Sequence, residues 1–201
     1  MGRVSKVGNW QTARRILEAG PVQLRNAVNR AVLQEAQLYK KEIVQGITTG
    51  SPGGESFAPL SETTLATRKF LGMGGSKPLI ARGDLRRSIS VVQGPFGSAF
   101  VGILRSAKGQ EGQSLTNVAE VHEFGKTIVV RMTEKAKRFL AMVFRRAGLE
   151  SGSKGKGASI LVVRIPARPF LKPVFEKLSK DAPERVTRRL ARLLAGDFGG
   201  G

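Results

Sequence analysis

Four short segments punctuate the sequence, and each places a residue that turns or caps the backbone beside a large apolar residue. They are residues 79–89 (LIARGDLRRSI), 121–125 (VHEFG), 132–135 (MTEK) and 165–171 (IPARPFL). Glycine accepts positive φ, proline fixes φ and lacks an N–H, and threonine and aspartate cap helices. The segments therefore predict the turning points and anchors of one small domain, and none of them contains a catalytic set.

The length and composition suit one globular domain with flexible ends. A chain of 201 residues is long enough to bury a substantial core. Hydrophobic residues make up 40% of the chain but aromatic residues only 6%, so we expect a mainly aliphatic core. We expect an N-terminal arm at residues 1–20, a single α+β domain at 21–195 with long loops at 50–78 and 105–116, and a flexible tail at 196–201.

Apolar residues at helical spacing predict a long N-terminal helix and a middle amphipathic helix. The first is expected to begin at Gly20-Pro21, because proline at the first helical position loses no hydrogen bond, and to end at residues 46–50. The second follows the N-cap residue Thr133 and stops at Gly148. Their apolar faces consist of Leu24, Ala27 or Val28, Ala31, Leu38, Tyr39 and Ile43, and of Ala136, Phe139, Leu140, Val143, Phe144 and Ala147.

Two further helices are expected to be less regular. A short helix is expected to begin at Ser61 and reach Phe70. A C-terminal helix begins at Pro169, carries Phe170 towards the core, and is interrupted or restarted at Pro183.

Runs of β-branched and apolar residues predict the strands. Residues 88–92 and 99–104 flank a Gly- and Pro-containing turn and form an antiparallel hairpin in this interpretation. Further strands are expected at residues 127–131 and 160–163, and the second of these is expected to be buried. The fold class that follows is α+β, with a small antiparallel β-sheet packed with a long N-terminal helix, a middle amphipathic helix and a C-terminal helix, joined by long loops.

Positive charge is the strongest compositional signal. The formal net charge is +19, and residues 126–192 hold 18 of the 34 Lys and Arg residues against 5 of the 15 Asp and Glu residues. Such a surface attracts nucleic acid or an acidic protein. Cysteine is absent, so no disulfide forms, and no apolar run approaches the roughly 20 residues that a membrane-spanning helix needs. We therefore expect no membrane partner.

The sequence contains no recognisable catalytic, cofactor-binding or metal-binding set. Residues 125–127 (GKT) match the last three residues of the phosphate-loop motif, but Glu120 stands at the position where that motif requires its first glycine. His122 is the only histidine, and with Glu120 and Glu123 it falls short of the three or four spaced ligands that zinc prefers. We therefore expect neither enzyme activity nor a cofactor, and we interpret His122 as a structural or interface residue.

Two groups of residues within or near the four segments are the candidates for function. Turning points and apolar side chains are expected to anchor the core, and these are Gly83, Leu85, Ile89, Phe124, Gly125, Pro166, Pro169 and Phe170. Basic residues beside them, or in the glycine-rich loop at 151–157, are expected to contact a partner, and these are Arg82, Arg86, Arg87, Arg168, Lys154 and Lys156.

The ordered segments resemble those of the phage virion-morphogenesis and tail-completion proteins, and more distantly the neck proteins of long-tailed phages. In that family a Gly-x-Leu-Arg-x-Ser-Ile turn precedes a hairpin, a Glu-Phe-Gly segment follows, and Pro-Ala-Arg-Pro-Phe-Leu leads the C-terminal helix. Here these are residues 83–89, 123–125 and 166–171, and the helix that begins with Thr133-Glu134-Lys135 resembles the middle insertion of the family. The resemblance spans about residues 20–180.

The resemblance implies a structural virion protein that forms a sixfold ring at the head–tail junction. The ring would assemble in the bacterial cytoplasm and join the head connector or adaptor to the tail terminator or tail tube around the DNA channel, with the loops at 50–78 and 105–116 as contacts. The basic C-terminal region would face DNA or an acidic partner. The alternative is a basic nucleic-acid-binding protein, which the charge and the helices at 133–147 and 183–195 favour, although few aromatic residues remain for base stacking.

Overall fold

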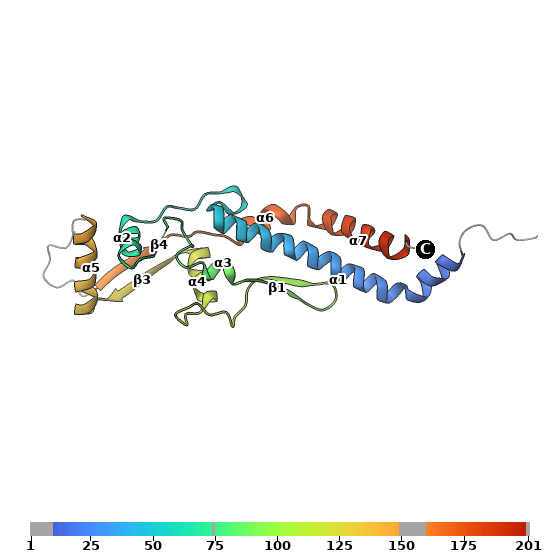
Figure 1. Cartoon of the computed structure of the whole chain (residues 1–201), viewed down its shortest axis with the longest axis horizontal. Helices are drawn as coiled ribbons and strands as arrows, with labels where there is room; N and C mark the ends of the chain where they lie inside the picture. The colour runs from blue at the N-terminus through green and yellow to red at the C-terminus, as the bar shows by residue number, and fades with distance from the viewer. Residues whose placement is uncertain (1–9, 74, 149–159, 200–201) are drawn as a thin grey trace, which may run out of the picture. The chain divides into compact units, whose positions relative to one another are not determined.

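The computed structural model describes residues 10–73, 75–148 and 160–199 and has an α+β fold, as predicted (Figure 1). Two small sheets take the place of the one expected sheet: β1 pairs with β2, and β3 pairs antiparallel with β4. The elements are α1 (Trp10–Thr49), a 3₁₀ turn (Pro52–Gly54), α2 (Glu62–Phe70), α3 (Asp84–Arg87), β1 (Ile89–Gln93), β2 (Ala99–Ile103), α4 (Leu115–Phe124), β3 (Lys126–Arg131), α5 (Glu134–Ala147), β4 (Ile160–Ile165), α6 (Lys172–Ser179) and α7 (Ala182–Gly199).

The chain divides into two compact units. Unit 1 comprises the described residues of Met1–Lys40, Ser90–Val101 and Leu178–Gly201, and unit 2 comprises those of Lys41–Ile89 and Gly102–Lys177. Each unit has its own buried residues, so each is considered by itself.

In unit 1, α1 presents small side chains that let its neighbours approach closely. Ala27 and Ala31 are completely buried, and Ala36 is nearly so. The turn between β1 and β2 reaches this helix, where the Gly97 N–H donates to Asn29 Oδ1 at 3.1 Å. A Cβ at Gly97 would lie 2.7 Å from Val28, and the φ of Gly97 is +68°, so this contact requires glycine.

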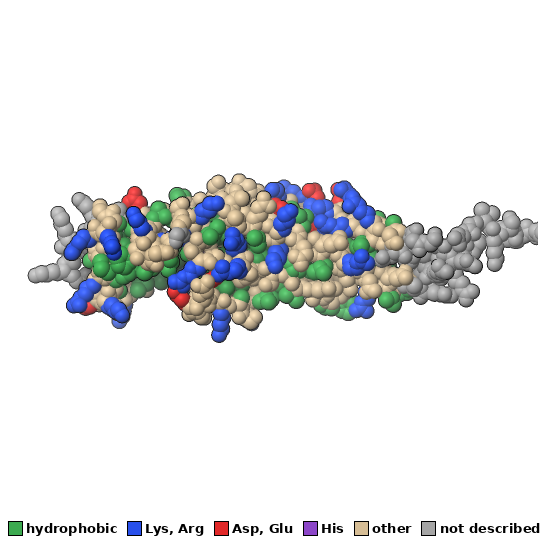
Figure 2. Space-filling model, in the orientation of Figure 1, with side chains coloured by type: hydrophobic (Ala, Val, Ile, Leu, Met, Phe, Trp, Pro, Cys, Tyr) green, Lys and Arg blue, Asp and Glu red, His purple; other side chains and the backbone are tan. Residues whose placement is uncertain are grey.

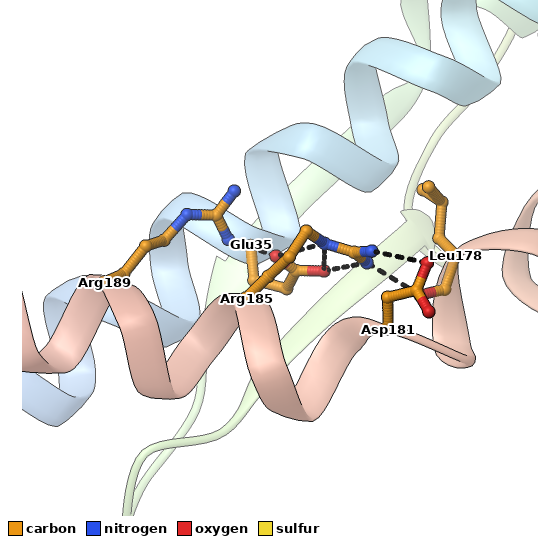
Figure 3. A network of polar contacts seen from close by, with 5 residues as sticks. All are labelled: Glu35, Leu178, Asp181, Arg185 and Arg189. Atoms are coloured by element: carbon orange, nitrogen blue, oxygen red, sulfur yellow. Dashed lines mark hydrogen bonds and ion pairs between the residues drawn. The ribbon is translucent and has the colours of Figure 1, made fainter.

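A buried carboxylate joins α1 to α7 in unit 1 (Figure 3). Glu35 Oε1 accepts from Arg185 Nε at 3.0 Å and from the Arg185 terminal nitrogen Nη2 at 2.5 Å, and Glu35 Oε2 accepts from Arg189. The Glu35 side chain is only 8% exposed. The hydrogen bond to Glu35 raises the pKa of the Arg185 guanidinium. The pKa of the nearby Tyr39 hydroxyl is also raised, mainly by burial and to a lesser extent by the charge of Glu35.

The core of unit 2 is aliphatic, as the composition predicts, and Phe170 is the largest side chain fully buried in it. α1 ends there with Ile43 and Ile47 completely buried. α2 packs against α5, and the rings of Phe70 and Phe139 meet edge to face with their centres 5.5 Å apart. The remaining well-buried apolar side chains of unit 2 belong to Leu85, Ile89, Ile103, Leu115, Ala119, Val143 and Val174.

The caps predicted from the sequence hold the short helices of unit 2. The Ser61 hydroxyl accepts from Thr64 N at 3.3 Å, and the Thr133 hydroxyl accepts from Ala136 N at 3.2 Å. Gly148 ends α5 in the left-handed conformation with φ of 66°. These contacts confirm the expected helices at residues 61–70 and 133–147, because each satisfies backbone groups that a helix end leaves without partners.

The ends of the two terminal helices differ from the prediction. α1 begins at Trp10 and contains Pro21, so the predicted start at Gly20-Pro21 is wrong and residues 10–20 are helical. A proline inside a helix removes one hydrogen bond and bends the axis without always ending it, and Figure 1 shows α1 bent in its dark blue N-terminal part. α7 continues to Gly199, into the predicted tail. Leu24, expected on the buried face, is 47% exposed.

The second strand of the β3–β4 hairpin is not buried, contrary to the sequence prediction. Ile160 is 57% exposed and Val162 is 54% exposed. A run of apolar residues predicts burial on both faces only when other elements cover both faces, and this two-stranded sheet has an uncovered face. None of the helices in the described part of the chain combines the length and apolar character needed to cross a bilayer.

Replacing Glu35 with Gln is expected to lower the free energy of unfolding by about 2–3 kcal/mol, because two arginines would lose their carboxylate partner. The loss is smaller than for a fully buried pair since the Arg185 and Arg189 side chains are 22% and 23% exposed. Urea denaturation measures it. Glu184→Gln, an exposed carboxylate on the same α7, is the control and should cost under about 1 kcal/mol. Equal losses in both variants would contradict a stabilising role for Glu35.

Candidate functional site

Glu123, in the last turn of α4, binds the backbone that leads into α6. Its Oε2 accepts from Phe170 N at 2.9 Å and from Leu171 N at 3.2 Å, and its Oε1 accepts from Lys172 N at 2.8 Å. The first N–H groups of a helix have no partners inside that helix. Glu123 therefore caps α6 from 49 residues away in the sequence, and it holds the segment in which Phe170 is buried.

Arg168 forms a second set of hydrogen bonds at the segment that leads into α6. Its side chain donates from Nε to the Ala58 carbonyl at 2.8 Å and from Nη2 to the Pro59 carbonyl at 2.7 Å. Its backbone N–H donates to the carbonyl of His122. Arg168 is only 5% exposed. Its two side-chain hydrogen bonds join the loop after α1 to the segment before α6. The side chain of Arg168, which the sequence predicts at a partner contact, is buried and hydrogen-bonds to two backbone carbonyls of the same chain.

Gly125 allows α4 and the end of β4 to approach closely. Its φ is +74°, and an added Cβ would lie 2.9 Å from Ala167 N and 3.0 Å from the Ile165 carbonyl oxygen. The neighbouring Phe124 is 75% exposed. The anchor role predicted for Gly125 is therefore confirmed, and the one predicted for Phe124 is wrong, because the backbone of Gly125 and not the Phe124 ring makes the close contact.

The proline positions of the fourth segment bound its turn as expected, although the helix begins later. Pro166 follows directly after β4, which ends at Ile165. α6 begins at Lys172, so the predicted start at Pro169 is three residues too early. The residues between form the backbone that Glu123 holds, and sequence periodicity cannot show a cap from another helix.

The charged residues beside Gly83 also make contacts within the same chain. Gly83 has φ of 78°, and Leu85 and Ile89 after it are buried, which confirms these three anchors. Asp84 Oδ1 accepts from Arg87 at 2.5 Å, and its Oδ2 accepts from Gln110 N at 3.2 Å. The turn is thereby tied to the loop at 105–116.

The other predicted contact residues bind within the chain or lie outside the described residues. Arg82 donates to Glu111 at 2.5 Å, and Arg86 donates to the Thr48 hydroxyl at 3.5 Å. Lys154 and Lys156 lie outside the described residues. Arg87 remains exposed although it pairs with Asp84, so it is the most accessible of the four arginines among the predicted contact residues.

The β3–β4 hairpin carries an uncovered apolar surface. Val129 pairs with Val162, and Arg131 pairs with Ile160, and directly opposed residues of an antiparallel pair share one face. Val129 is 63% exposed, compared with 57% for Ile160 and 54% for Val162, the other two apolar residues of this face. The outer face of the hairpin, as we call it, consists of Thr127, Val129, Arg131, Ile160, Val162 and Arg164, all of them exposed.

Basic residues lie on the same end of unit 2 as this apolar surface. Figure 2 shows hydrophobic side chains gathered at the end of unit 2 that α5 and the hairpin form, with Lys and Arg side chains around them. Arg131 and Arg164 belong to the outer face itself, and Lys135 and Arg138 on α5 are exposed. Apolar patches with a polar rim are typical of protein interaction sites. In the described residues, no three His, Cys, Asp or Glu side chains cluster as metal ligands.

Sequence reasoning missed the structural roles of Glu35 and Glu123. Glu35 lies between Ala31 and Tyr39 at four-residue spacing, so a carboxylate within an apolar stripe was the available signal. In the sequence Glu123 stands out only beside His122, as part of an inadequate zinc-ligand set, whereas its true partners are 47 to 49 residues further along the chain. No local pattern indicates contacts at that separation.

Comparisons with known proteins add no assignment. No protein-family model matches the chain, and neither a curated protein nor a solved structure matches it. The functional interpretation therefore depends on the residues and their geometry.

Glu123→Ala is expected to lower the free energy of unfolding by about 2–3 kcal/mol, because three backbone N–H groups would lose a charged acceptor. Glu120→Ala removes an exposed carboxylate from the same helix and should change stability by under about 0.5 kcal/mol. Chemical denaturation followed by circular dichroism measures both values. If Glu123→Ala matches Glu120→Ala, Glu123 is not the cap of α6.

Gly125→Ala is expected to destabilise the protein by about 1–3 kcal/mol more than Gly112→Ala. Both glycines have positive φ, at +74° and +78°, so alanine is strained at either position. Only at Gly125 would the new Cβ meet backbone atoms within 3.0 Å, since Gly112 has open space around it. Thermal unfolding of the two variants measures the difference, and equal shifts would mean that the close approach at Gly125 is unimportant.

Proposed function

We propose that the chain is a structural assembly protein of a tailed phage, which forms a ring at the head–tail junction and surrounds the DNA channel. The outer face of the hairpin carries this proposal, because Val129, Ile160 and Val162 are each more than half exposed on one face of a two-stranded sheet. Burying such side chains against another protein is favourable, at about 25 cal/mol per Å² of apolar surface. An assembled state would supply the cover that the isolated chain lacks.

The use of charge at the four segments also supports an assembly role. Asp84, Glu123 and Arg168 hold loops and helix ends in place through contacts within unit 2. Groups used in this way position the backbone and are not arranged around a shared reaction centre. The order of the segments resembles tail-completion proteins, and that resemblance is the source of the virion setting in this proposal.

The proposed assembly is a sixfold ring of copies that joins the head connector or adaptor to the tail terminator or tail tube. A ring requires a contact between two different surfaces that repeats until it closes. In this proposal the outer face of the hairpin supplies one of these surfaces in each copy. The ring would assemble in the bacterial cytoplasm and remain in the virion, where genomic DNA passes through it.

A nucleic-acid-binding function is the second candidate, and exposed arginines favour it. Arg188 and Arg192 lie four residues apart on α7 and are exposed, as are Arg138 and Arg145 on α5. Phosphate contacts by such residues would make binding strongly dependent on salt. Tight DNA binding by the monomer with a steep salt dependence would favour this second candidate over the ring.

Replacing Val129 and Val162 together with Lys is expected to abolish oligomer formation, because two charges would replace the apolar centre of the outer face. Native mass spectrometry and light scattering after size exclusion measure the oligomeric state. Both side chains are more than half exposed, so the variant should fold as the parent does. Val92→Lys, at a 43% exposed valine on β1, is the control and should leave the oligomer intact.

The parent protein is expected to form a discrete closed oligomer in the same measurements. A parent chain that stays monomeric at all concentrations would overturn the ring. An oligomer that survives the double substitution would instead show that another surface joins the copies.

A further inference from the structure

A cavity of about 980 Å³ in unit 2 lies where the two long loops meet the hairpin. Residues from both loops line it, including Leu60 and Gln113, and so do β4 and the facing side of α5. Most of the lining is apolar, with Leu140, Phe144 and Val163 among the contributors. A space of this size and character is large enough for several side chains of another protein.

Five basic side chains line the cavity. Arg82 pairs with Glu111 and Arg164 is exposed, whereas the other three hydrogen-bond to carbonyl groups or have a nitrogen without a partner. Arg168 donates to the carbonyls of Ala58 and Pro59, and Arg68 donates to the carbonyl of Lys77 at 2.9 Å. The buried Nδ1 of His122 has no hydrogen-bond partner among the described residues. We refer to Arg68, His122 and Arg168 as the cation cluster.

The carboxylates that line the same cavity pair with arginines outside the cation cluster, and one of these arginines, Arg82, also lines the cavity. Asp84 pairs with Arg87, and Glu111 pairs with Arg82. In the described part of the chain no ion pair joins a carboxylate to any member of the cation cluster. Three groups that can carry positive charge therefore share a partly buried space without a negative partner.

The electrostatic consequences agree with this geometry. Burial lowers the pKa of His122, and the charges of Arg168 and Arg68 lower it further. Burial lowers the pKa of Arg168 in the same way, with a smaller contribution from Arg68. A buried charge without an opposite partner is costly, and a carboxylate brought to this position would remove much of that cost.

We propose that the cavity receives an Asp or Glu side chain carried on an apolar segment of an acidic partner protein. The apolar lining would bind the segment, and the cation cluster would bind the carboxylate. The net charge of +19 favours an acidic protein as the donor, because opposite charges attract the two proteins before contact. This inference rests on the proposed assembly function and specifies the chemistry of the partner that docks on the ring.

Nuclear magnetic resonance on the full chain tests the proposal, because His122 is the only histidine and its imidazole gives one identifiable set of resonances. The probe is the acetylated and amidated peptide Ser-Leu-Glu-Leu-Phe-Ser, and the matched control peptide has Gln in place of Glu. The Glu peptide is expected to shift the His122 resonances and to bind about tenfold or more tightly than the Gln peptide. Equal affinities would overturn the proposal.

Arg68→Gln is expected to reduce the affinity for the Glu peptide about tenfold and to leave that for the Gln peptide unchanged. Arg25→Gln removes an exposed arginine that does not line the cavity and should change neither affinity. Because the peptide pair is compared on the unaltered protein, an Arg68 variant that fails to fold does not decide the outcome.

Other ligands provide the contrary outcomes. The fatty acid decanoate is the second probe. If decanoate binds and shifts the His122 resonances but the Glu peptide does not bind, the cavity is a site for small amphiphilic acids, and the proposal of a protein partner is overturned. Inorganic phosphate that displaces the peptide at equal concentration would make it a general anion site, which also overturns the proposal. Oligomer formation is measured separately, so a chain that forms rings but ignores the peptide would refute this inference alone.

Discussion

The contact on which unit 2 most depends is the carboxylate of Glu123 binding three consecutive backbone N–H groups at residues 170–172. It fixes where α6 begins and keeps Phe170 buried. Arg168 extends the same junction to the loop after α1 through two carbonyl groups. A helix end, a buried ring and a distant loop are thus held by two charged side chains that act at one junction, residues 168–172.

Charge is used differently in the two units. In unit 1 the buried carboxylate of Glu35 has two arginine partners, so the charges are paired (Figure 3). In unit 2 the buried Arg168 has carbonyl partners, and Arg68 and His122 beside it have no carboxylate among the described residues. A low-dielectric surrounding strengthens both the pairing and the repulsion. The unpaired group, together with the uncovered hairpin, is what points to a partner.

Local sequence patterns predicted the elements whose causes are local. Thr133 and Gly148 bound α5 because a cap and a left-handed stop act within one helical turn. Gly83 turns the chain for the same reason, since its own φ is what the position requires. The hairpin of β1 and β2 was also predicted, because its turn lies between adjacent strands. The start of α1 was wrong because a proline inside a helix removes only one hydrogen bond.

The sequence by itself therefore determined the α+β class, most of the helices and strands, and the strongly basic surface, since these follow from spacing, caps and composition. Only the tertiary structure decided which charged residues are buried and which apolar residues are not. Arg168 is enclosed and Phe124 is exposed, although the sequence suggested the opposite for both. The reason is that burial depends on elements distant in the chain, and no local pattern records which of them cover a given face.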